Sequence, residues 1–148
     1  MSFHGEEGRQ AVFDFAGLPL PGWHQALAAG LAERTGPAGG LRTLASAGSC
    51  WAVTKRLVRF VASQPGAPAT PGSLTRAHME GFLRHRAAAI GSPAAWREVR
   101  MAGRLLSSLP GGHKSPGWGL ILGFALLWIL DGLAAFFLHR SFDRSSGS

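Results

Sequence analysis

Arginines at helical spacing are the residues of this chain that could do chemistry. Arg97, Arg100 and Arg104 are three and four residues apart, and Arg56 and Arg59 repeat the shorter spacing. Residues so spaced lie on one side of a helix. A row of guanidinium groups can bind the phosphates of DNA, because each neutralised phosphate releases a condensed counterion. We therefore expect contact with duplex DNA; the alternative is a solvated basic face that binds nothing.

The positive charge of the chain is concentrated in one segment. Of 15 Lys and Arg, 11 fall within residues 35–115, together with only Glu80 and Glu98 as acidic residues. Such a density attracts polyanions, either nucleic acid or an anionic lipid surface. Phosphate contacts position a protein without reading bases, so the pattern predicts no sequence preference. The candidate DNA-binding residues are Arg42, Lys55, Arg56, Arg59, Arg84, Arg86, Arg97, Arg100 and Arg104.

The other residues that could bind a metal or act as a nucleophile lack the neighbouring residues that such a site needs. His78 and His85 are seven residues apart and share one helix side, but a zinc site needs three or four convergent ligands. Ser49 and Cys50 lack the flanking glycines of a nucleophile elbow. Cys50 is the single cysteine, so it cannot form an internal disulfide, which fits a reducing cytoplasm. We expect no metal, no cofactor and a small buried Cys50.

Hydrophobic periodicity predicts the helices that position these residues. Loops rich in Pro and Gly separate the apolar repeats, and Thr75 and Ser92 are expected N-caps. The prediction is an all-α helical domain over residues 21–110, preceded by an extended arm at 1–20, with no strand. The four helices are expected over residues 23–34, 41–63, 74–86 and 92–109.

Three tryptophans, Trp23, Trp51 and Trp96, lie on the apolar stripes of separate predicted helices. Base stacking is the alternative for such residues. We expect core packing, because aromatic residues at helical spacing usually face inward.

An apolar run at residues 117–138 carries a single charge, Asp131. Its 22 residues are long enough, at helical rise, to cross a hydrocarbon core. We expect a transmembrane helix there, after a linker at 111–116 and before a disordered tail at 139–148. More basic residues precede the run than follow it, which places the helical domain on the cytoplasmic side. The alternative is a fifth helix that packs on the bundle or on another chain.

Three stretches carry a family resemblance. They are FDFAGLP at residues 13–19, RLVRFV at 56–61 and LTRAHMEGFL at 74–83. Their order and separation resemble the N-terminal core-binding (SAM-like) domain of tyrosine recombinases, the phage integrase family, of actinobacterial type. The resemblance covers about residues 13–109.

This resemblance implies an orthogonal bundle of four helices that clamps one face of duplex DNA, while a separate catalytic domain clamps the other face. The chain contains no tyrosine, so the family's phosphotyrosyl chemistry is not expected. The departure from the family begins after Leu109, as in a truncated integrase gene. The prediction is a non-catalytic DNA-binding domain, cytoplasmic and nucleoid-associated, with a membrane anchor if 117–138 inserts. The alternative is a single-pass membrane protein whose basic cytoplasmic bundle binds anionic lipid or a protein partner.

Overall fold

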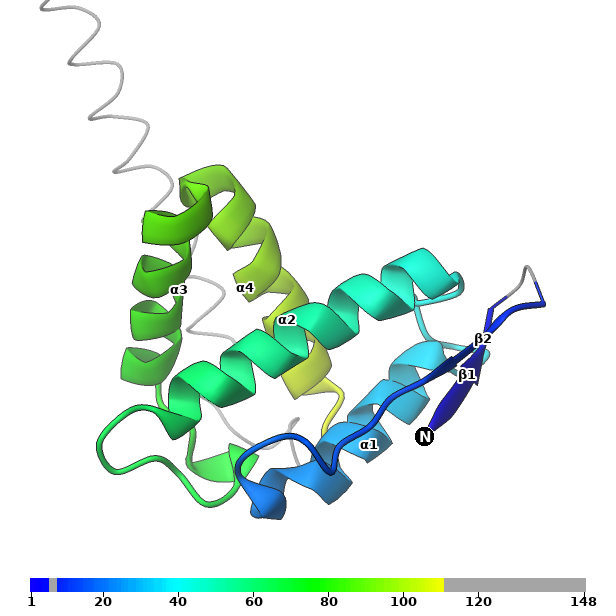
Figure 1. Ribbon diagram of the computed structural model, residues 1–148, viewed down its shortest axis with the longest axis horizontal. Helices are drawn as coiled ribbons and strands as arrows, with labels where there is room; N and C mark the ends of the chain where they lie inside the picture. The colour runs from blue at the N-terminus through cyan, green and yellow to red at the C-terminus, as the bar shows by residue number, and fades with distance from the viewer. Residues whose placement is uncertain (6–7, 111–148) are drawn as a thin grey trace, which may run out of the picture.

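The computed structural model describes residues 1–5 and 8–110 (Figure 1). This part of the chain is mostly helical, and the four predicted helices are confirmed. The elements in chain order are β1 (Ser2–His4), β2 (Gln10–Val12), α1 (Pro21–Thr35), α2 (Leu44–Ala62), the 3₁₀ turn η1 (Pro71–Ser73), α3 (Arg76–Ile90) and α4 (Ser92–Ser107).

The helix starts follow from local chemistry. The Thr43 and Thr75 side chains cap α2 and α3, each in a reciprocal pair with the residue three positions on. The predicted cap at Ser92 is wrong, because Gly91 occupies the N-cap of α4 and Ser92 is already helical. Gly91 has φ 83°, a conformation that favours glycine. Gly91 is therefore the single residue that connects α3 to α4.

The predicted end of the third helix, near Arg86, is also too early. The helix continues to Ile90 through three alanines, at positions 87 to 89. Alanine has the highest helix propensity of any residue, so nothing in this segment ends the helix before Gly91.

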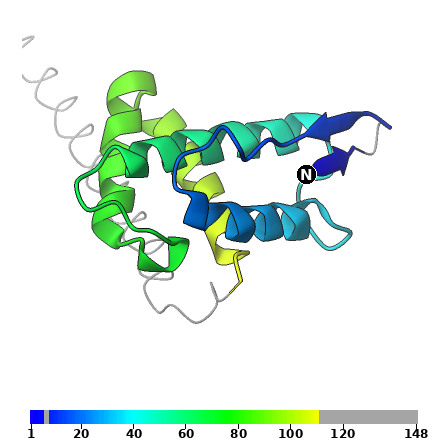
Figure 2. The ribbon, with the colours of Figure 1, turned by 60° about the horizontal axis from the view of Figure 1, so that its bottom comes forward.

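The helices enclose one main core. α4 contacts α1, α2 and α3, and its packing with α3 is the most extensive in the domain. Figures 1 and 2 show α1 and α2 running alongside one another, with α3 and α4 grouped toward one end of α2. The largest fully buried side chains include Trp23, Leu27, Leu57, Phe82 and Leu105.

The expected inward packing of the tryptophans is confirmed for Trp23, which is fully buried and donates its indole N–H to the Pro68 carbonyl at 2.9 Å. Trp51 and Trp96 are half-buried and pack against the core from its edge.

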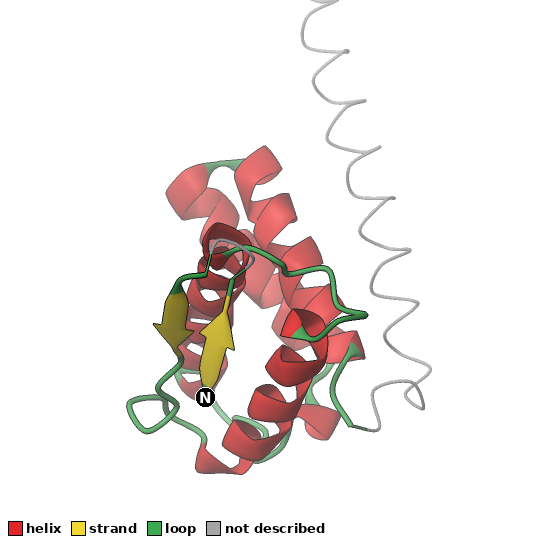
Figure 3. Cartoon of the chain, turned by 90° about the vertical axis from the view of Figure 1, so that its right-hand side faces the viewer, coloured by secondary structure: helices red, strands yellow, loops and turns green. Residues whose placement is uncertain are grey.

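The expectation of no strand is wrong. β1 and β2 form an antiparallel hairpin in which Phe3 pairs with Ala11 (Figure 3). Phe3 and Phe13 are buried against Ala47 of α2, in a second small core. The rings of Phe13 and Phe15 lie 5.4 and 5.0 Å from the Trp51 ring. The first residues are therefore fixed on α2 by aromatic packing.

Several predictions concern residues 111–148, outside the described part of the chain. These are the linker at 111–116, the hydrophobic helix at 117–138 and the tail at 139–148. Within residues 1–5 and 8–110, no helix combines the length and the apolar character needed to span a membrane.

Candidate nucleic-acid interface

The outer side of α4 carries Arg97, Arg100 and Arg104, which we call the α4 arginine face. All three side chains are exposed. At about 100° per residue they lie opposite the side of α4 that buries Ala95 and Val99. Within residues 1–5 and 8–110, none of the three has a carboxylate partner. Their charges therefore face outward without local compensation.

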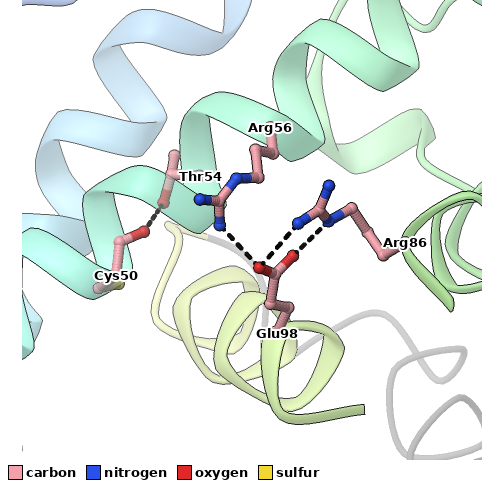
Figure 4. A network of polar contacts seen from close by, with 5 residues as sticks. All are labelled: Cys50, Thr54, Arg56, Arg86 and Glu98. Atoms are coloured by element: carbon pink, nitrogen blue, oxygen red, sulfur yellow. Dashed lines mark hydrogen bonds and ion pairs between the residues drawn. The ribbon is translucent and has the colours of Figure 1, made fainter. Parts of the chain in front are cut away.

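Glu98 connects three helices through an ion-pair network. Arg86 of α3 donates from Nε to Glu98 Oε2 at 2.7 Å and from Nη2 to Oε1 at 3.2 Å. Arg56 of α2 donates from Nη1 to Oε1 at 2.7 Å. Figure 4 shows both guanidinium groups converging on the one carboxylate. The Arg86 and Glu98 side chains are each only 14% exposed. Two of the predicted DNA-binding residues thus have a structural role within the bundle.

The remaining predicted residues are spread over other surfaces. Arg84 is exposed, on a different side of α3 from Arg86. Lys55 places its ammonium group 5.8 Å from the centre of the Trp51 ring, within cation–π range. Arg42 lies in the loop before α2 and donates to the Pro37 carbonyl at 3.2 Å. The nine residues therefore lie on three helices, α2, α3 and α4, and on the loop before α2.

A basic pocket lies between α2 and α3. Its volume is about 330 Å³, and it is lined by Arg56, Arg59, Phe60, Ser63, Gln64, His85 and Arg86. No local pattern in the sequence suffices to indicate this pocket, because it depends on how α3 packs against α2. Gly81 favours this close packing, since a Cβ there would lie 3.2 Å from Phe60 Cζ and the Phe60 ring would have to shift slightly. The spacing of Arg56 and Arg59 was its only sequence signal.

The two histidines of α3 have separate roles. The His78 ring nitrogen Nδ1 accepts a hydrogen bond from the Thr75 backbone N–H at 3.0 Å, which completes the cap of α3. The His85 ring lies 5.3 Å from the Phe60 ring, at the pocket. The described residues contain no group of three potential metal ligands.

Cys50 is buried, as predicted, on the inner side of α2. Burial raises the pKa of its thiol, and this outweighs the opposing effects of the Arg34 charge and a hydrogen bond with Thr54. Thr54 also donates from Oγ1 to the Cys50 carbonyl at 2.7 Å (Figure 4). A protonated, buried thiol is a poor nucleophile.

Comparison with known proteins gives no relative: no protein-family model, no curated protein and no solved structure matches this chain. The resemblance to tyrosine recombinases therefore stays a prediction from the sequence motifs at residues 13–19, 56–61 and 74–83.

Proposed function

We propose that this helical domain binds duplex DNA through the α4 arginine face and performs no covalent chemistry on it. The observation that carries the proposal is the placement of Arg97, Arg100 and Arg104. They share one exposed helix side, with no carboxylate partner in the described part of the chain. A solvated salt-bridged face would show interleaved acidic residues instead.

The length of the face suits the spacing of phosphates. From Arg97 to Arg104, an α-helix rises about 10 Å. One strand of B-DNA places a phosphate every ~3.4 Å along the helix axis, so the face spans about three phosphates. Arginine also suits this role because its planar group can donate two parallel hydrogen bonds to a phosphate.

The charge distribution supports the same function. Residues 1–5 and 8–110 contain twelve Lys and Arg but only four Asp and Glu. Two of these acids are already engaged, since Glu80 pairs with Arg76 at 2.7 Å and Glu98 pairs with two arginines. The excess positive charge must therefore be balanced by solvent ions or by a polyanionic partner.

The arrangement of helices supports a domain of the SAM-like, core-binding type. α2 crosses α4, and the C-terminal end of α2 lies beside α3, an arrangement that fits an orthogonal bundle (Figure 1). In the recombinases that the motifs resemble, such a bundle grips one face of DNA. These 148 residues contain no tyrosine, the residue through which those enzymes link covalently to DNA, so the proposal includes no such step. The proposed activity is binding alone, and a membrane anchor at residues 117–138 stays a prediction.

The test compares duplex DNA with a lipid surface. Fluorescence anisotropy would follow the full-length chain binding a labelled duplex of mixed sequence, at about 50 mM and about 200 mM salt. Co-sedimentation would measure binding to vesicles that contain phosphatidylserine. The proposal expects binding to DNA that weakens steeply with salt. Binding to vesicles with none to DNA at the lower salt would overturn it and favour the membrane alternative.

A pair of charge-matched variants tests the location of the interface. Arg100→Gln removes one charge from the centre of the α4 arginine face, and Arg9→Gln removes one from the exposed end of the hairpin. Loss of one phosphate contact should weaken binding about five- to tenfold at the lower salt. Arg9→Gln should weaken it less than about twofold. Equal losses would show that the protein binds DNA through its net charge rather than through α4.

A further inference from the structure

The basic pocket between α2 and α3 is lined by residues that are not part of the α4 arginine face. Three of its lining residues are the arginines Arg56, Arg59 and Arg86, and a fourth is His85. No carboxylate lines it, although Glu98 lies behind Arg56 and Arg86 as their partner. Three guanidinium charges against one carboxylate leave the pocket with a net positive charge. Its chemistry is therefore that of an anion site.

The ion-pair network holds two of the pocket arginines in place before any ligand binds. Glu98 engages Nη1 of Arg56, and it engages Nε and Nη2 of Arg86. Arg56 therefore keeps its Nε and Nη2 donors, and Arg86 keeps its Nη1 donors, for another acceptor. Arg59 is exposed and pairs with no carboxylate in the described part of the chain. A ligand would meet two fixed guanidinium groups, which lowers the entropy lost on binding.

The pocket also has an aromatic side. The Phe60 ring contacts two rings of α3, with ring centres 5.7 Å from Phe82 and 5.3 Å from His85. Ser63 and Gln64 add hydroxyl and amide groups at the end of α2. At about 330 Å³, the pocket matches the smaller of the cavities that hold organic ligands. The combination of guanidinium donors with an aromatic surface suits a phosphorylated ligand that carries a planar ring.

We propose that the basic pocket binds the phosphate monoester of a nucleotide, with the arginines on the phosphate and the base against Phe60 and His85. This site is separate from the α4 arginine face and requires no duplex. The phosphate could belong to a free mononucleotide or to the 5′ end of a strand, which share this chemistry. The loss of either site would leave the other intact.

The test is calorimetric titration of the full-length chain with adenosine 5′-monophosphate, adenosine and inorganic phosphate. We expect the monophosphate to bind about five times more tightly than inorganic phosphate, because stacking adds to the charge contacts, and adenosine to show no binding. Adenosine binding as tightly as the monophosphate would overturn the proposal, as would no binding of the monophosphate. A 5′-phosphorylated trinucleotide that binds more tightly than the mononucleotide would identify a strand end as the source.

Two pocket variants and one control locate the binding. Arg59→Gln removes a charged donor from an exposed position and should weaken binding of the monophosphate about tenfold. His85→Gln should reduce the preference for the monophosphate over inorganic phosphate, because it removes a ring from the stacking surface. Arg9→Gln, far along the chain on the hairpin, should leave the affinity unchanged. Equal affinities for Arg59→Gln and Arg9→Gln would contradict the assignment, and so would an unchanged preference in His85→Gln.

Discussion

Replacing Glu98 by Gln should destabilise the bundle far more than the loss of an ordinary surface charge. The substitution keeps the side-chain volume but removes the negative charge that three helices share. Arg86 would then stay inside the bundle, 14% exposed, with its positive charge uncompensated. Arg56 would lose its partner as well, but its 44% exposure lets water replace the carboxylate. Most of the cost should therefore arise at Arg86.

The size of the effect follows from this partial burial. Breaking a fully buried pair costs about 3–5 kcal/mol. The residual exposure of Arg86 and Glu98 reduces this to about 2–3 kcal/mol, since water screens part of the charge. For a domain of this size, each kcal/mol lowers the melting temperature by about 4–8 °C. Glu98→Gln should thus melt roughly 10–20 °C below the wild type.

A matched control is available on α3. Glu80 pairs with Arg76 one helical turn away, and both side chains are more than two-fifths exposed. Exposed pairs of this kind contribute about 0.3–0.5 kcal/mol, so Glu80→Gln should lower the melting temperature by only a few degrees. Thermal and urea unfolding, followed by circular dichroism on full-length chains, would measure both variants. If Glu98→Gln is no less stable than Glu80→Gln, the network does not hold the three helices together.

Two further predictions concern buried groups. Burial raises the pKa of the Cys50 thiol in the folded state, so the unfolded thiol ionises first as the pH rises past about 8.5. The free energy of unfolding should therefore fall on the alkaline side. This part of the fall should be absent from the variant Cys50→Ala. The native thiol should also react with a disulfide reagent at pH 8 far more slowly than in urea, and equal rates would contradict its burial. Trp23→Phe removes a buried hydrogen bond to Pro68 and part of a fully buried ring, so urea titration should show a loss of about 2–3 kcal/mol. Trp96→Phe, at a half-buried position, should lose less, and equal losses would contradict the central placement of Trp23.

Local patterns were sufficient to predict the helices and the α4 arginine face. The spacing of Arg97, Arg100 and Arg104 fixes their common side once α4 forms, whatever its neighbours do. The hairpin was missed because each strand has only three residues, too few for a strand pattern. What fixes β1 and β2 is the burial of Phe3 and Phe13 on α2.

The features that local patterns do not predict depend on contacts between residues far apart in the sequence. Arg56 and Glu98 are 42 positions apart, so no local pattern reveals that they pair. Arg76 and Arg84 both lie four residues from Glu80, so helical spacing alone does not say which of them pairs with it; in the structure Glu80 pairs with Arg76. The basic pocket is not predictable from local patterns either, since it depends on how α3 packs against α2, just as the Glu98 network depends on how α4 packs against both.

The salt dependence of DNA binding tests the central claim most directly. Anisotropy titrations of the wild type and of a variant with Arg97, Arg100 and Arg104 all replaced by Gln would give the slope of log affinity against log salt concentration. Each phosphate contact contributes about 0.9 to this slope, so loss of the face should reduce its magnitude by roughly 2.7. A variant with the slope of the wild type would contradict the proposal that the α4 arginine face lies on DNA.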